Sequence, residues 1–387
     1  MVRSLHRRAR HVAVIMLIAH VGICAQVPGA RRSSGAWRID SKPIFDVGAE
    51  TGDMLDTFGE VVGAARVPNG DIVVADAKYY SLRYFAPDGK FRREVGRKGD
   101  GPGEFQSIMR MIRCGDSLYV QERGTSVWSV FGATGMFKRK YLPVLPSAHD
   151  RIPYDTRCTA AGLLIHDGWE NPADRKPGVF RSKIPFWIAN SDGSIRARLG
   201  DFPSGERFGT VSQDTRRLNG TGPLPLGKQP VLAIGRTRAY VGTADSFAIN
   251  VFTIDGKPLG MIRKPNVNLR TTPSDIQRFI ALDTAGKPED LKAHLLRDYK
   301  EITFPRTIPA YRNLVVDSDD DLWVERYPGG SEVASHWVVF SPTGTELAQV
   351  ELPLNLTVQE IGHDYVLGIA AEPPDGVHHV KMFRLMR

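Results

Sequence analysis

The chain has 387 residues, of which 42% are hydrophobic and 24% are charged. This composition suits a globular protein with a large core and excludes a disordered chain. The formal net charge is +8, but four arginines within residues 1–25, which contain no acidic side chain, supply half of it. No dense run of lysine or arginine follows, so we expect no nucleic-acid partner.

Residues 1–25 predict an export signal. Basic residues precede an apolar run at 12–23, which is too short to span a bilayer as a helix. We expect cleavage after Ala25, followed by a flexible segment at 26–36. Lipid attachment at Cys24 is an alternative, although the residue before it is bulky for that motif, and an uncleaved signal anchor is another. The protein should therefore be periplasmic or extracellular, with no membrane span once the signal is removed.

A hairpin pattern recurs along the rest of the chain. An apolar strand ends in a two-residue turn that contains glycine, and a second strand follows. Glycine accepts the positive φ that such turns require. Five copies lie at 82–96, 127–142, 186–200, 249–263 and 337–352, and a sixth at 377–385 stops before its turn.

A second repeated element precedes each hairpin. It is a turn and a short β-branched or aromatic strand that ends in polar residues, with a less polar strand running into it. The copies lie at 69–76, 114–123, 160–170, 235–245, 319–327 and 362–372. Each unit thus predicts four strands in meander order, and the shorter spacings are about 45 residues, the length of one propeller blade.

The last unit has only three strands of its own, and residues 37–47 form a spare strand at the other end of the mature chain. We expect this strand to complete the last unit, because closure removes exposed sheet edges. The prediction over 37–387 is an all-β fold: a six-bladed β-propeller of four-stranded antiparallel blades, closed by the N-terminal strand.

Two insertions interrupt the repeat. Residues 204–230 are rich in glycine, proline and arginine and predict a loop. Residues 271–300 predict a helical hairpin, because Thr272 can cap a helix that has Pro273 in its first turn, and apolar residues then recur at helical spacing. Its apolar side should cover the rim or the mouth of the propeller, either as packing or as a gate.

Residues 69–91 and 96–105 resemble a known family. GRKGDGPGEF at 96–105, with NGDIVVADAKYYSLRYFAPDGKF at 69–91 before it, is similar to NHL-type six-bladed propellers, and most of all to exported bacterial propellers without known function. The resemblance supports the fold. It implies no single chemistry, because such propellers include binding modules as well as amidating lyases and lactonase-like hydrolases.

In that family the glycine-rich loop links the outer strand of one blade to the inner strand of the next. The residues suit this structural role, because glycine permits sharp turns, proline fixes φ and an aromatic ring can wedge between blades. Contact with an anion or a ligand is the alternative. The blade-linking residues are Gly99, Gly101, Pro102, Gly103, Glu104 and Phe105.

Polar residues end several of the second strands. In a meander blade the loops that follow these strands share a face with the crossings between blades. That face also receives both insertions and the long connection at 167–183, so we expect any ligand site there. For each candidate the alternative is an ion pair between blades or a turn hydrogen bond. The candidates are Asp76, Glu122, Arg123, His166, Asp167, Trp169, Glu325, Arg326 and Tyr327.

Two cysteines remain after signal removal, Cys114 and Cys158, at nearly matching points of adjacent units. Export would place them where disulfides persist, so the alternatives are a disulfide and two buried thiols. The acidic run at 317–321 lacks the glycine and the closing glutamate of a calcium loop, and predicts a solvated acidic turn.

No catalytic motif stands out, since there is no G-x-S-x-G and no ordered Ser/His/Asp set. We predict no metal and no cofactor, with calcium or zinc at the channel mouth as the alternative. The expected function is a monomeric, non-catalytic propeller that binds a protein or a small polar ligand. The alternative is a propeller hydrolase or lyase with a metal.

Overall fold

The computed structural model describes residues 37–48, 57–123, 127–142, 153–167, 172–211, 218–372 and 377–387. The predicted signal at 1–25 and the segment at 26–36 lie outside these residues. The chain divides into two units, Met1–Ser33 and Ser34–Arg387, and everything described here belongs to the second. None of the described helices is long and apolar enough to cross a membrane.

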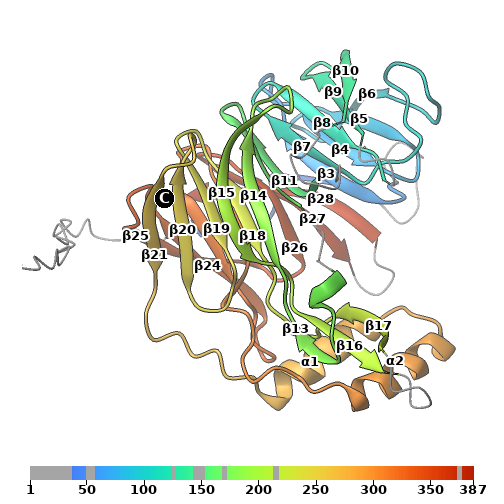
Figure 1. Cartoon of the computed structure of the whole chain (residues 1–387). Coiled ribbons are helices and arrows are strands. Elements are labelled where there is room, and N and C mark those ends of the chain that lie inside the picture. Colours follow the sequence, from blue (N-terminus) through green and yellow to red (C-terminus); the bar gives the residue numbers. More distant parts are fainter. Residues whose placement is uncertain are drawn as a thin grey trace, which may run out of the picture. The chain divides into compact units, whose positions relative to one another are not determined.

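Short antiparallel strands build the described unit, mainly as four-stranded sheets (Figure 1). The first sheet contains β3 (Val61–Arg66), β4 (Ile72–Asp76), β5 (Ser81–Phe85) and β6 (Phe91–Val95). The second contains β7 (Arg110–Cys114), β8 (Ser117–Gln121), β9 (Trp128–Gly132) and β10 (Phe137–Tyr141). The third contains β11 (Pro153–Thr159), β12 (Gly162–Asp167), β14 (Lys183–Ala189) and β15 (Ile195–Pro203).

Three further sheets continue the pattern. The fourth contains β18 (Val231–Ile234), β19 (Arg238–Gly242), β20 (Ala248–Thr253) and β21 (Pro258–Arg263). The fifth contains β22 (Tyr311–Val316), β23 (Leu322–Arg326), β24 (Ala334–Phe340) and β25 (Glu346–Pro353). The sixth contains β26 (Leu356–Ile361), β27 (Tyr365–Glu372) and β28 (Val377–Met386), with β1 (Arg38–Ile39) and β2 (Phe45–Val47) both paired to β28.

The strands of a sheet differ in burial, and the first sheet illustrates why. All five residues of β4 and of β5 are buried. The strand β4 (IVVAD) is apolar up to its last residue, as suits a strand that is covered on both faces. The strand β5 (SLRYF) buries Ser81 and Arg83 beside its apolar and aromatic residues. The last strand, β6, exposes its central charged residues. Charge on an outer strand opposes edge-to-edge association.

The N-terminal segment that the sequence marks as a spare strand pairs with the last strand of the chain. Arg38 pairs with Met386, and Phe45 pairs with Met382. The segment forms two short strands rather than one. Pro43 lies between them, where it removes a backbone donor.

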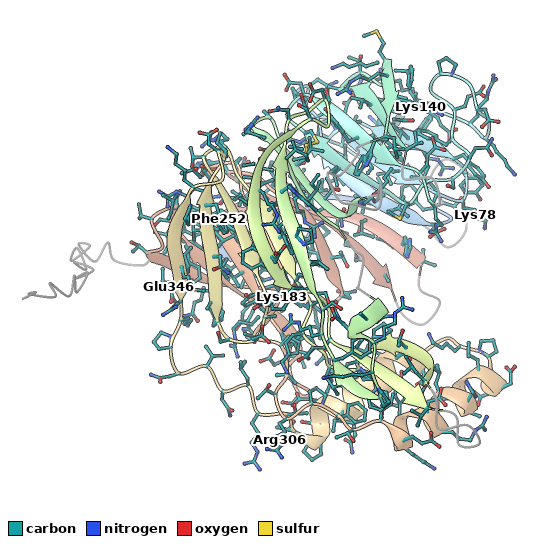
Figure 2. The ribbon with its side chains drawn as sticks, viewed as in Figure 1. Lys78, Lys140, Lys183, Phe252, Arg306 and Glu346 are labelled. Carbon is teal, nitrogen blue, oxygen red and sulfur yellow. A yellow bond between two sulfur atoms is a disulfide. The ribbon has the colours of Figure 1, made fainter. Side chains whose placement is uncertain are left out.

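The sheets pack face to face, and the cores lie between them. The first strands of successive sheets contact one another: β3 with β7, β7 with β11, β11 with β18, β18 with β22, and β22 with β26, while β26 contacts β3. Away from these first strands, aromatic side chains fill the space between neighbouring sheets. Phe252 of the fourth sheet (Figure 2), for example, packs edge-on against Phe202 of the third, with ring centroids 6.2 Å apart.

The prediction of a loop at 204–230 was wrong. Two segments of this insertion, β16 (Arg207–Val211) and β17 (Leu218–Pro223), pair as antiparallel strands, and β13 (Gly178–Phe180) pairs with β16 to make a small three-stranded sheet. The strand β13 lies in the long connection between β12 and β14, after the short 3-10 helix η1 (Pro172–Asp174). Because the pairing joins two connections far apart in the sequence, neither shows it alone.

The helical hairpin forms as predicted, from α1 (Pro273–Thr284) and α2 (Glu289–Glu301). Thr272 and Asp275 make a capping box, in which each side chain bonds the backbone amide of the other residue. The two helices meet through Phe279 and Tyr299, with ring centroids 5.7 Å apart.

The glycine-rich loop is anchored in the core. Phe105 is fully buried among residues of the first and second sheets, with its ring centroid 5.6 Å from that of Phe131. Gly96 has φ +95° and approaches so closely that a Cβ would lie 2.6 Å from the Phe105 ring. Glu104 accepts hydrogen bonds from the Gly101 amide (2.9 Å) and Arg97 Nε (2.7 Å), which lower the pKa of its carboxyl.

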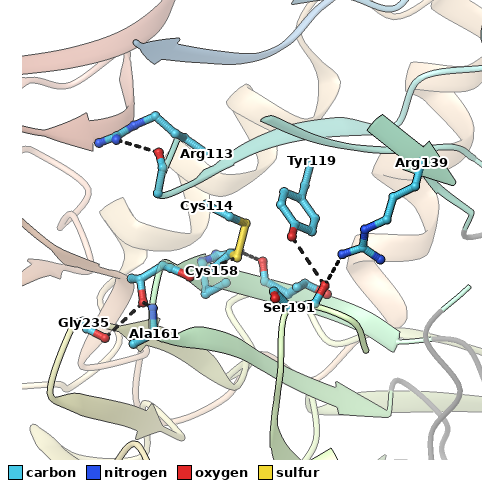
Figure 3. The surroundings of a disulfide bond; sticks show 12 residues. Arg113, Cys114, Tyr119, Arg139, Cys158, Ala161, Ser191 and Gly235 are labelled. Carbon is cyan, nitrogen blue, oxygen red and sulfur yellow. Dashed lines mark hydrogen bonds between the residues drawn. A yellow bond between two sulfur atoms is a disulfide. The ribbon is translucent and has the colours of Figure 1, made fainter. Parts of the chain in front are cut away.

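A disulfide joins Cys114 of β7 to Cys158 of β11, with the two Cα atoms 5.2 Å apart. It therefore links the first strands of the second and third sheets. Figure 3 shows a polar link beside it, where the carbonyl of Ser191 accepts hydrogen bonds from Tyr119 Oη (3.4 Å) and Arg139 Nη2 (2.6 Å). One covalent bond and several hydrogen bonds thus fix this pair of sheets.

Candidate functional site

Asp76, at the end of β4, is fully buried and holds the chain before β3. Its carboxylate accepts hydrogen bonds from the backbone amides of Gly59 (2.9 Å), Glu60 (3.1 Å) and Lys78 (3.1 Å). Arg83 lies 4.0 Å away. Both carboxylate oxygens are engaged within the protein, which is the turn role that the sequence analysis left open as the alternative.

Glu122 and Arg123, which follow β8, also contact neighbouring protein groups. Glu122 is buried, pairs with Lys140 (3.3 Å) and accepts a hydrogen bond from the Gln106 amide (3.2 Å). Arg123 is largely exposed and reaches Glu60 ahead of the first sheet (3.3 Å). Three other candidates cannot be placed in this way: the side chains of His166 and Asp167, which end β12, and all of Trp169 lie outside the described residues.

The candidates of the fifth sheet lie beside a cavity. Glu325 is buried, and its Oε1 accepts hydrogen bonds from Arg312 Nη2 (2.6 Å) and Ser335 Oγ (2.5 Å). Arg326 lies 3.9 Å from Glu332. The next residue, Tyr327, lines the cavity itself.

This cavity, which we call the α1 pocket, has a volume of about 700 Å³. That is within the usual range for small-molecule sites. Its walls come from α1, from the connection between β17 and β18, from the start of β22, and from the chain after β23 and at the end of β25. It is lined by Leu226, Asp275, Arg278, Phe279, Leu282, Asp283, Arg312, Tyr327, Pro328, Val333, Pro353, Leu354 and Asn355.

Most of the wall is apolar, and some of it is open to solvent. Leu282 is 68% exposed and Val333 is 90% exposed. Burial of such side chains is favourable, by about 25 cal/mol for each Å² removed from water. A ligand in the α1 pocket would therefore gain affinity by covering them.

The two acidic groups of the pocket are already occupied. Asp275 is buried and accepts hydrogen bonds from the Thr272 amide (2.7 Å) and the Gly330 amide (2.7 Å). Asp283 accepts a hydrogen bond from the Tyr299 hydroxyl, and Lys287 lies 3.9 Å away. These carboxylates cap and brace the helical hairpin.

The basic groups keep spare donors. Arg278 uses Nη1 to reach the carbonyls of Gly329 (3.0 Å) and Glu332 (2.6 Å), and Arg312 uses Nη2 to reach Glu325. Since a guanidinium has five N–H groups, most of them remain unused within the described part of the chain.

Tyr327 lines the pocket together with Arg278 and Arg312. Burial raises the pKa of its hydroxyl, Asp275 adds to the rise, and both Arg312 and Arg278 oppose it. Among the described residues the Tyr327 hydroxyl has no hydrogen-bond partner.

The sequence analysis selected Tyr327 and Glu325 as candidates but did not select the other residues that line the pocket. One signal was present in α1, where Asp275, Arg278, Phe279, Leu282 and Asp283 follow the spacing of a single helical face. Arg312 offered another, as a charged residue within the apolar strand YRNLVV.

The acidic turn at 317–321 is solvated only in part: Asp319 is exposed as predicted, whereas Asp317 and Asp320 are buried. Asp317 is buried and accepts a hydrogen bond from Trp323 Nε1 (2.8 Å), and Arg387 lies 2.7 Å from Asp317 and 3.6 Å from Asp321. Burial and the neighbouring aspartates raise the pKa of Asp321 to about 6, against the opposing effect of Arg387. Within the residues that the structure describes, no group of three or more His, Cys, Asp or Glu side chains could hold a metal ion.

No family profile and no curated protein matches the chain. Several solved structures are similar to it over most of its length. A candidate exported protein of Bacteroides fragilis is 12% identical, with 92% of this chain and 96% of the other covered and a TM-score of 0.47. A member of the DUF4221 family from Bacteroides vulgatus is 10% identical, with 92% and 99% covered and a TM-score of 0.48. A gluconolactonase of Xanthomonas campestris is 15% identical, with 85% and 87% covered and a TM-score of 0.42. Likenesses at this level carry no argument about what the present chain binds.

Proposed function

We propose that this chain is an exported, non-catalytic β-propeller that binds a small ligand in the α1 pocket. The proposal has three parts: the propeller arrangement, the export and the binding. Each is supported by a different observation.

The propeller arrangement is supported by the contacts of the first strands. Each of these six strands contacts the next, and the last, β26, contacts the first, β3. The pairing of β1 and β2 with β28 supports closure of the sixth blade by the N-terminal segment. Six blades arranged in a ring leave only short, protected strand edges.

Export is supported by the N-terminal sequence and by the cysteines. Basic residues and a short apolar run at 1–25 fit a signal peptide. The disulfide between Cys114 and Cys158 fits an oxidising compartment such as the periplasm or the extracellular space.

Binding is carried by the α1 pocket. It combines a volume suited to a small molecule with apolar walls and a few polar groups, which is the composition of most small-molecule sites. Its lining comes mainly from the connections on one side of the sheets, where the sequence analysis placed any ligand site. Helix α1 supplies five of the lining residues.

The test uses a neutral fluorescent probe, Nile red, with two matched substitutions in the hairpin. Leu282 lines the pocket, whereas Leu291 of α2 is 44% exposed and does not line it. We expect Leu282→Gln to weaken probe binding about fivefold or more through lost apolar contact, and Leu291→Gln to leave it unchanged. Equal effects of the two substitutions, or saturable binding that neither alters, would place the probe elsewhere and refute the pocket as the site.

A further inference from the structure

The α1 pocket has an asymmetry in its polar groups that identifies the charge of its ligand. The carboxylates of Asp275 and Asp283 are bonded to donors of the protein, whereas the Arg278 and Arg312 guanidinium groups and the Tyr327 hydroxyl have donors to spare. A ligand therefore meets several unused N–H and O–H donors in the pocket.

A hydrogen bond to a buried residue of the fifth sheet holds the guanidinium group of Arg312. Its Nη2 donates to Glu325 Oε1, and the same oxygen accepts from Ser335 Oγ. Glu325 is only 4% exposed, so this support is packed within the fifth sheet. A guanidinium held in one orientation loses little freedom when it binds a second partner.

Arg278 is fixed in a similar way by two carbonyls of the connection after β23, those of Gly329 and Glu332. Because these partners are carbonyls, its positive charge has no bonded carboxylate within the described part of the chain. Tyr327 lines the same pocket as both guanidinium groups, which oppose the rise in the pKa of its hydroxyl. Three donors from three elements thus line the pocket.

We propose that the α1 pocket binds an amphipathic carboxylate, with the carboxylate on Arg278, Arg312 and Tyr327 and the apolar body on Phe279, Leu282 and Val333. Charge-assisted hydrogen bonds from guanidinium to carboxylate are short, strong and often bidentate. The exposed apolar wall supplies the remaining affinity. This inference rests on the proposed function, because it requires the pocket to be a ligand site.

The charges around the head group favour this chemistry. The charged groups that line the pocket are Arg278, Arg312, Asp275 and Asp283, and Glu325 is paired with Arg312. Each of the three carboxylates already accepts hydrogen bonds. Arg278 and Arg312, in contrast, have N–H groups that no described residue accepts, and an anionic ligand would fill them.

The experiment compares decanoate with decanol, which has the same chain without the charge, by titration calorimetry on the full mature protein. Arg312→Gln alone would strand the buried Glu325, so the test variant is Arg312→Gln with Glu325→Gln, and Glu325→Gln alone is the matched control. We expect the parent protein to bind decanoate about tenfold more tightly than decanol. The control should keep most of this preference, because a glutamine at position 325 still offers Arg312 a side-chain oxygen as acceptor. The double variant, and separately Arg278→Gln, should lose most of this preference and keep their affinity for decanol.

Each other outcome decides a different point. If decanol binds as tightly as decanoate while Leu282→Gln still weakens Nile red, the carboxylate proposal is wrong and the pocket stands. If the double variant keeps the tenfold preference, the assigned head-group site is wrong. If neither compound nor Nile red binds, the proposed function fails as well.

Discussion

The acidic turn at 317–321 should make the stability of the protein depend on pH. Asp321 lies beside Asp317 and within reach of Arg387, with 14% of its side chain exposed. Burial, together with the like charges, raises its pKa from 3.8 to about 6 in the folded protein. The carboxyl is therefore easier to protonate in the folded chain than in the unfolded chain.

The sign of the effect on stability follows from linkage. A group whose pKa is raised by folding stabilises the protein below its unfolded pKa, and this contribution is lost as the pH rises through the folded value. A shift from 3.8 to about 6 corresponds to about 3 kcal/mol. Between about pH 4 and pH 7 the free energy of unfolding should thus lose up to this amount on account of Asp321 alone.

The perturbation is Asp321→Asn, which resembles the protonated acid in shape and cannot ionise. We expect the variant to match the parent protein near pH 4 and to be more stable by about 3 kcal/mol at pH 7.5. The assay is reversible urea unfolding, with the disulfide intact, over that pH range. Asp319→Asn is the matched control, because Asp319 lies in the same turn and also contacts Arg387 (2.9 Å).

The control should keep most of the pH dependence of the parent protein. Parallel stability curves for the parent protein and Asp321→Asn, or a variant that is less stable at pH 7.5, would refute the reasoning. Either result would mean that Arg387 and the donors of the turn compensate fully for the buried charge.

Two further predictions concern the joints between sheets. Phe105→Ala should lower the free energy of unfolding by about 3–5 kcal/mol, because the ring is fully buried between the first two sheets; a loss below about 1 kcal/mol in urea unfolding would contradict its role as a wedge. Replacement of Cys114 and Cys158 by serine should cost about 2–4 kcal/mol, and dithiothreitol should destabilise the parent protein but not this double variant; equal sensitivity to the reductant would show that the bond does not stabilise the fold.

The strands themselves could be predicted from the sequence, because a strand is a local pattern. Short apolar runs separated by glycine turns repeat along the chain, and each predicted hairpin is found as two paired strands. The capping box at Thr272 likewise predicts where α1 begins. The spare strand at 37–47 could be matched to the last strand because the repeat left that position open.

The small sheet and the α1 pocket could not be predicted in this way. The pairing of β13 with β16, and the meeting of α1 with the connections after β23 and β25, join segments far apart in the sequence. A polar residue at the end of a strand has the same local pattern whether it holds a turn, as Asp76 does, or lines a cavity, as Tyr327 does. The partners of a side chain depend on long-range packing, so only the tertiary structure separates the two roles.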